Sequence, residues 1–177
     1  MSDYKEGPPP QVNYVCGFYF SFEVERVLLI RKMKPAWQRG SCNGLGGKIE
    51  HGESPSQAMR REFFEESELQ TLESGWKEYA YLHGLNGGRE EGGPYGVHFF
   101  AYHGQLTASE LAEVANQHWH KFVKMPGEFE SLTVVSVHEL RYRRVLPNLK
   151  WLVPMAYNIL KGDDACTMFD VHEQQYR

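Results

Sequence analysis

The sequence predicts an α+β fold in which helices pack over a mixed β-sheet. Short runs rich in aromatic and β-branched residues recur along the chain, one helix start is strongly specified, and a second segment has helical spacing. The strand-like runs are scattered among the helical segments. This order favours a mixed sheet covered by helices.

Five segments have the length and composition of strands. They cover 14–22, 27–30, 79–83, 97–102 and 132–137. The glycine-rich segment 84–96 lies between two of them, so we expect a long hairpin loop there.

Two segments are predicted to be helices. In the first, Ser54 can cap the helix, Pro55 suits its first position, and Gln57 can complete a capping box. The second covers 107–120, where Leu111, Val114 and Trp119 are the expected buried positions.

The 177 residues, 41% of them hydrophobic, suffice for one well-filled domain. We expect it to cover 13–161, with loosely packed tails at 1–12 and 162–177. A formal net charge of −4 without a block of basic residues argues against extended nucleic-acid binding. We expect neither a signal peptide nor a membrane span, and the three cysteines suggest free thiols in the cytoplasm.

The segment 40–69 carries the chemistry. It opens with NGLGGK at 43–48, whose three glycines allow a ligand to approach the backbone closely. In the helix that follows, Glu62, Glu65 and Glu66 share one face at spacings i, i+3 and i+4, where like charges repel. A bound Mg²⁺, which prefers oxygen ligands, would relieve this repulsion; a solvated acidic surface is the alternative.

The wider spacing resembles the Nudix box of the Nudix hydrolase family. From Gly47 to Leu69 the pattern of this 23-residue motif is matched without a gap at every position but one. The matching residues are Gly47, Glu53, Arg61, Glu62, Phe63, Glu65, Glu66 and Leu69. The exception is Glu68, where the family has glycine; Glu68 must either extend the helix or adopt a left-handed conformation.

The resemblance implies the Nudix fold, an α/β/α sandwich, and assigns roles to residues of the box. Glu62 and Glu66 would be the main metal ligands, with Glu65 as a further ligand or a base. The main-chain carbonyl near Gly47 would be another ligand, while Glu53 and Arg61 would together hold the loop to the helix.

Family members often carry a further carboxylate outside the box, in a loop before a later strand. Glu128 and Glu130 occupy such a loop here, and Glu130 is preferred. Two solvated loop acids are the alternative. Either Glu65 or Glu130 is then the expected general base.

The sequence around the box is most similar to the branch that hydrolyses oxidised purine nucleoside triphosphates such as 8-oxo-dGTP. By this similarity Asn43 reads a base edge, Trp37 lines the pocket, and Lys48 is a further substrate contact. Asn148 belongs to a second base-reading segment, but Asn148-Leu149 replaces two adjacent acids of some members, so the base stays open. The alternatives are that Asn43 shapes its own turn and that Trp37 is a surface aromatic.

The resulting hypothesis is Mg²⁺-dependent hydrolysis of a nucleoside triphosphate to the monophosphate and pyrophosphate, with Mn²⁺ as an acceptable substitute. Two alternatives remain: hydrolysis of a diphosphate-linked nucleotide such as ADP-ribose, a nucleotide sugar, a dinucleoside polyphosphate or capped RNA, and nucleotide binding without catalysis. The expected partner is a small nucleotide, and the sequence leaves a homodimer open.

Overall fold

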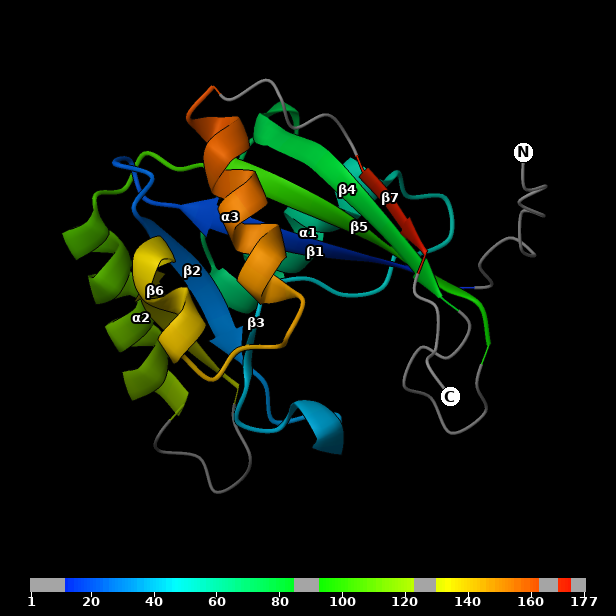
Figure 1. Cartoon of the computed structure of the whole chain (residues 1–177). Helices are drawn as coiled ribbons and strands as arrows, with labels where there is room; N and C mark the ends of the chain where they lie inside the picture. The colour runs from blue at the N-terminus through cyan, green and yellow to red at the C-terminus, as the bar shows by residue number, and fades with distance from the viewer. Residues whose placement is uncertain (1–11, 85–92, 123–129, 163–168, 173–177) are drawn as a thin grey trace.

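The described residues of the computed structural model, 12–84, 93–122, 130–162 and 169–172, form a seven-stranded mixed sheet covered by helices (Figure 1). The strands follow the order β3-β2-β1-β5-β4-β7, and β6 pairs with β2. Their bounds are β1 Val12–Phe20, β2 Arg26–Arg31, β3 Cys42–Asn43, β4 Trp76–Gly84, β5 Tyr95–His103, β6 Ser131–Ser136 and β7 Phe169–His172.

The sheet contains both parallel and antiparallel pairings. Strand β1 runs parallel to β5 and antiparallel to β2, while β4 is antiparallel to β5 and parallel to β7. Strand β2 pairs antiparallel with β6 over its whole length, from Arg26 opposite Ser136 to Arg31 opposite Ser131. The β2–β6 register determines which side chains meet at the site.

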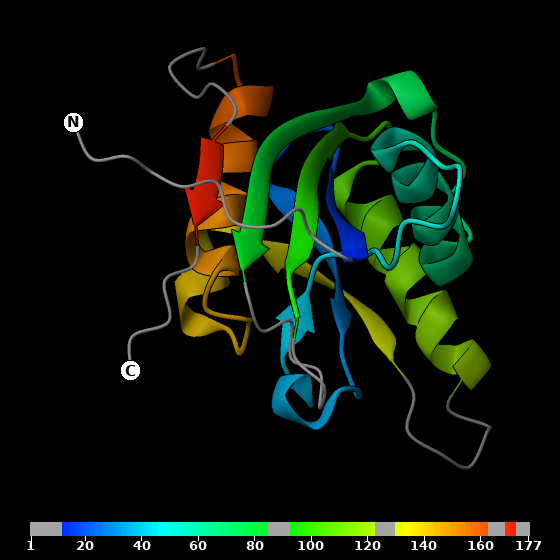
Figure 2. The ribbon, with the colours of Figure 1, turned by 90° about the vertical axis from the view of Figure 1, so that its right-hand side faces the viewer.

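Helices cover both faces of the sheet. The helices α1 (Pro55–Ser67) and α2 (Ala108–Phe122) lie on one face, and α3 (Leu149–Leu160) with the 3₁₀ segment η3 (Val137–Tyr142) lies on the other (Figure 2). The expected α+β fold, an α/β/α sandwich around a mixed sheet, is therefore confirmed.

Strand β1 shows why its sequence is so rich in large apolar side chains. Val15 and Tyr19 pack in the core beneath α1 and α2, whereas Phe18 and Phe20 pack in the core beneath α3. A central strand with both faces buried needs no polar alternation. The continuous apolar run is thus the signature of its position.

The five predicted strands and both predicted helices are present, with shifted ends. The strand predicted from Tyr79, for example, begins at Trp76. Leu111 is fully buried and Val114 is half-buried in α2; the side chain of Trp119 lies outside the described residues. The residues 85–92 of the expected hairpin loop, and Glu128, also lie outside them.

Two short strands were not predicted. Strand β3 has two residues, and β7 lies within 162–177, the segment expected to be a tail. There it pairs with β4 and extends the sheet beyond position 161. Strand β7 depends on pairing with β4, far away in the sequence, and β3 with its two residues is too short for composition to indicate it. The domain boundaries themselves remain a prediction.

The start and end of α1 follow from local chemistry. Ser54 Oγ accepts from the Gln57 amide at 3.2 Å, and Gln57 Oε1 accepts from the Ser54 amide at 2.9 Å, which is the predicted capping box. At the other end Glu68 adopts a left-handed conformation with φ 61°, and its amide donates to the Phe64 carbonyl. Of the two conformations expected for Glu68, the structure has the second.

In the described part of the chain, no helix is long and apolar enough to cross a bilayer.

Replacement of Glu68 by glycine should stabilise the fold. A side chain in this conformation costs about 1–2 kcal/mol, and glycine removes this cost. The greater freedom of glycine in the unfolded chain offsets part of the gain. We expect Glu68→Gly to raise the free energy of unfolding by about 1 kcal/mol and the Tm by about 2–4 °C. Glu68→Ala, which removes the charge and keeps the strain, is the control; an equal gain from both variants would assign the effect to charge.

Candidate functional site

The glycine segment 44–47 lies between β1 and α1. The Val15 amide donates to the Gly47 carbonyl at 2.8 Å, and the Gly17 amide donates to the Leu45 carbonyl at 2.7 Å. A Cβ at Gly46 would overlap the Val15 carbonyl, and Gly46 has φ 151°, a backbone conformation that side chains rarely adopt. The segment therefore fits against β1 only because these positions lack side chains.

Helix α1 presents its three carboxylates to this segment unequally. The side chains of Glu62 and Glu66 are only 16% and 17% exposed, while that of Glu65 is 56% exposed. The i, i+4 pair Glu62 and Glu66 thus faces inward over the glycine segment, and Glu65 lies at its solvent edge.

Glu66 is held directly by the glycine segment. Its Oε2 accepts from the Gly46 amide at 2.7 Å. Burial raises the pKa of Glu66 to about 7, although Lys32 and the Gly46 amide act in the opposite direction. A half-buried carboxylate of this kind is costly to keep charged without a nearby cation.

Glu62 explains why glycine is needed at position 47. A Cβ built on Gly47 would overlap the carboxylate of Glu62. The acid therefore lies directly against the main chain of the loop, and the carboxylates of Glu62 and Glu66 both meet the 46–47 backbone.

Arg61 connects the loop to the helix. Its Nε and Nη2 donate to the two oxygens of Glu53 at 2.7 and 2.8 Å, a bidentate pair, and Nη2 also donates to the Lys48 carbonyl at 3.0 Å. Its Nη1 donates to Glu62 at 2.8 Å and lies 3.4 Å from Glu65. The sequence-based pairing of Glu53 with Arg61 matches these contacts.

Lys32 is the site residue that sequence analysis missed. Its Nζ lies 2.7 Å from Glu130 Oε2 and 3.4 Å from Glu66 Oε1, while the Met33 amide donates to Glu130 Oε1. Burial disfavours the Lys32 ammonium, but Glu66 and Glu130 outweigh this effect and raise its pKa. The β2–β6 register continued by one residue places Lys32 opposite Glu130.

The donor set suits a hard divalent cation. Glu62 and Glu66 offer carboxylate oxygens beside main-chain groups of the glycine segment, and Mg²⁺ prefers such ligands. Within the described residues, no three acidic, histidine or cysteine side chains stand ready to hold a metal. Lys32 and Arg61 neutralise the carboxylates instead, so a metal would compete with these two side chains.

The Asn43 side chain is partly engaged by its own turn. Its Oδ1 accepts from the Gly44 amide at 2.8 Å and lies 3.8 Å from the Cys16 thiol. Burial raises the pKa of Cys16 to about 12 and also raises that of Cys42, so both are neutral thiols. The Gly44 contact is the turn-shaping alternative for Asn43. It engages the amide oxygen, so the Asn43 amide nitrogen can still bind a ligand.

Asn148 reaches the same end of the sheet as Asn43. Cys42 forms a parallel bridge with Val145, and the Leu146 amide donates to the Cys42 carbonyl at 3.0 Å. Asn148 then occupies the cap position of α3, where its side chain makes no capping hydrogen bond. The two predicted base-reading segments therefore lie side by side.

The other two substrate candidates are more exposed. Trp37 belongs to the 3₁₀ segment η1 (Ala36–Gln38) and is 60% exposed, and the Lys48 side chain is exposed. Neither has a contact that assigns it to the site, so their roles remain predictions.

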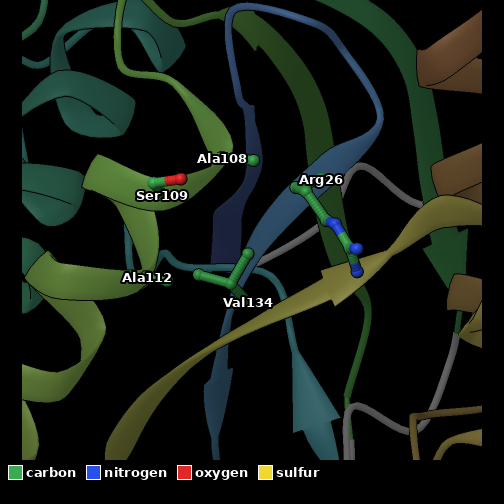
Figure 3. A pocket seen from close by; sticks show the side chains of 5 residues that line it. All are labelled: Arg26, Ala108, Ser109, Ala112 and Val134. Carbon is green, nitrogen blue, oxygen red and sulfur yellow. The ribbon is translucent and has the colours of Figure 1, made fainter.

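A hollow elsewhere on the surface is separate from this site. It measures about 330 Å³ and is lined by Arg26, Ala108, Ser109, Ala112 and Val134 (Figure 3). Arg26 begins β2, whereas Lys32 follows its end, so the hollow lies away from the acidic residues. None of its lining residues is a candidate site residue.

The contact between Gly47 and Glu62 predicts a non-additive pair of substitutions. Because an added methyl group would overlap the carboxylate, Gly47→Ala should lower the free energy of unfolding by about 1–3 kcal/mol. In the Glu62→Ala background the same substitution should cost less, since the overlapping group is gone. Urea unfolding of the native protein, the two single variants and the double variant measures the coupling. An equal cost of Gly47→Ala in the native and Glu62→Ala backgrounds would show that the strain does not come from Glu62.

The bidentate pair of Glu53 predicts a pH effect. Arg61 lowers the pKa of Glu53 from 4.5 to about 2. The charged pair therefore stabilises the fold above pH 4.5, and this contribution is lost as the pH falls towards 2. The stability difference between the native protein and Glu53→Gln should shrink over that range in urea midpoints. A difference independent of pH would show that this carboxylate is not paired.

Comparisons with known proteins agree with this fold and motif. The NUDIX domain family model matches residues 13–154. No curated protein matches the sequence.

Three solved structures illustrate the range of similar folds. A mutator MutT protein from Bacillus halodurans has a TM-score of 0.60 at 16% identity, over 92% of this chain and 90% of that chain. The Ap4A hydrolase of C. elegans has a TM-score of 0.53 at 13% identity, over 85% and 98%. The Nudix domain of Shewanella oneidensis NrtR, solved with ADP ribose, has a TM-score of 0.59 at 13% identity, over 90% and 99%.

At these identities the structures establish the fold and leave the substrate open. The family model, however, spans most of the chain and includes the helix with Glu62, Glu65 and Glu66. The chain therefore belongs to the Nudix family.

Proposed function

We propose that this protein hydrolyses a purine nucleoside triphosphate, with an oxidised deoxynucleotide such as 8-oxo-dGTP as the leading candidate, to the monophosphate and pyrophosphate. Mg²⁺ is the proposed cofactor, and Mn²⁺ is an acceptable substitute because it takes the same oxygen ligands.

One observation carries the catalytic part. Two half-buried carboxylates, Glu62 and Glu66, meet the main chain at Gly46 and Gly47, where there is no room for a side chain. An acidic surface helix would turn its carboxylates to solvent, and only Glu65 does so here. This arrangement supports a cation site better than it supports a solvated face.

The chain's residues would divide the work by position. Glu62, Glu66 and the carbonyl near Gly47 would hold the ion, which when bound supplies charge neutralisation at the phosphates and a more acidic water. Arg61 keeps the helix in register with the loop through Glu53 and the Lys48 carbonyl. Lys32, displaced from Glu66, would be free to face a phosphate oxygen.

Two glutamates compete for the role of general base. Both oxygens of Glu130 are held, by Lys32 and by the Met33 amide. Glu65 is the most exposed acid of α1, and Arg61 reaches it only at 3.4 Å. Glu65 is thus freer to accept a proton from water, and we assign it the role.

Asn43 and Asn148 support the nucleotide part of the proposal. They belong to two neighbouring segments at the end of β2, and the 3₁₀ segment carrying Trp37 is the next element after β2. An amide pair of this kind can form hydrogen bonds with a purine edge. A base that left these amide groups unpaired would bind less well.

Metal-dependent turnover tests the proposal. We expect Mg²⁺-dependent release of pyrophosphate from a nucleoside triphosphate, in a panel that includes oxidised dNTPs, ADP-ribose, nucleotide sugars, dinucleoside polyphosphates and capped RNA. Glu62→Gln and Glu66→Gln should each lower kcat by about 100-fold or more, since each removes a charged ligand. Glu113→Gln, an exposed acid on α2, is the matched control.

The panel separates the parts of the proposal. Preferential turnover of a diphosphate-linked compound would overturn the triphosphate assignment and retain the catalytic centre. Nucleotide binding without turnover, or turnover that survives both glutamine substitutions, would contradict the catalytic assignment.

A further inference from the structure

Basic side chains gather at one end of the sheet, although the protein as a whole is acidic. We call them the arginine strip, defined as Arg31, Arg39, Arg141, Arg143, Arg144 and Lys150. All six residues are exposed. The sequence-based argument against extended nucleic-acid binding relied on net charge and on the lack of a continuous basic block, and neither reveals basic residues that the fold brings together.

The fold joins three separate segments into this strip. Arg31 Nη1 donates to the Gly40 carbonyl at 3.1 Å, and Arg144 Nη2 donates to the Arg39 carbonyl at 3.0 Å, so 31–40 and 144 meet. The Cys42 amide donates to the Arg144 carbonyl at 2.9 Å, which continues this contact. Figures 1 and 2 show η3 beside α3 over one face of the sheet, and η1 beyond the end of β2.

The strip continues from there along η3 to α3. Arg141 and Lys150 line one hollow of about 320 Å³ together with His138. Arg143 forms an exposed ion pair with Glu139 at 3.1 Å. Among the described residues, no other carboxylate forms an ion pair with Arg31, Arg141, Arg143, Arg144 or Lys150.

The strip is separate from the acidic centre. Leu29 packs beneath α3, and Arg31, two residues later on the same strand, shares that side; Lys32 follows Leu28 and Ile30 on the side of α1. The strip therefore lies on the α3 side of the sheet end, across from the side that holds Glu66.

Exposed aromatic rings lie among these cations. Tyr142 is 75% exposed, with the Arg141 guanidinium 4.6 Å from the centre of its ring, and Trp151 next to Lys150 is 37% exposed. Arginines suit phosphodiester oxygens, and aromatic faces suit unstacked bases. A duplex stacks its base faces inside the helix, and an acidic peptide has no bases to stack on exposed aromatic rings. A single-stranded nucleic acid therefore fits this combination best.

We propose that the arginine strip binds the backbone of a single-stranded oligonucleotide, with Tyr142 and Trp151 as stacking platforms. The arginines Arg141 and Arg143 contact phosphodiesters, and the bases lie against the two aromatic rings. This binding is independent of the hydrolytic function, because it uses neither Glu62 nor Glu66.

Salt-dependent binding in EDTA tests the proposal without hydrolysis. The probe is a fluorescent oligo(dT) or oligo(U) of about 12 nucleotides, measured by anisotropy between about 50 and 200 mM salt. We expect Arg141→Gln/Arg143→Gln to weaken binding about tenfold and to reduce the salt slope by about 1.4, or about 0.7 for each lost phosphate contact. Tyr142→Ser should weaken binding with little change in that slope, because stacking releases no counterion.

The matched control is Arg26→Gln/Lys77→Gln, which removes two exposed cations outside the strip; Arg26 lines the hollow beside α2, on the other side of the sheet from α3. It should bind like the native protein, and thermal melts of all variants establish that each is folded. Absence of oligonucleotide binding at low salt, an equal loss in the control, or equal affinity for polyglutamate or anionic vesicles would each overturn the proposal.

Discussion

The seating of α1 on the glycine segment 44–47 is the constraint on which the rest of the site depends. Strand β1 holds the segment from one side through the amides of Val15 and Gly17. The helix closes on it from the other side, with Glu62 against Gly47 and Glu66 on the Gly46 amide. A side chain at Gly46 would overlap the Val15 carbonyl, and one at Gly47 would overlap the Glu62 carboxylate.

This seating creates an electrostatic problem that two cations solve. Arg61 binds Glu53 and Glu62 from the solvent side, and Lys32 binds Glu66 and Glu130 from the end of β2. Acids of like charge held at this density are unfavourable without such partners. The same two side chains would compete with an incoming divalent ion.

The sequence predicted the parts of the site that depend on local spacing. The capping box at Ser54 and the i, i+3, i+4 carboxylates depend on residues of a single helix, and the structure contains both. Lys32 could not be found this way, because its meeting with Glu130 depends on the register between two strands about a hundred residues apart. Strand β7 was missed for the same reason, because its Phe169 pairs with Ala80. The arginine strip also comes from three segments that only the fold brings together.

The central claim is that Glu62 and Glu66 form a cation site on the glycine segment. The most direct measurement is a crystal structure of the protein with Mn²⁺, whose anomalous signal locates the ion. The account predicts manganese between these two carboxylates and the backbone of Gly46 and Gly47, with Lys32 moved away from Glu66. Manganese bound only elsewhere, with the Lys32 to Glu66 pair intact, would contradict it.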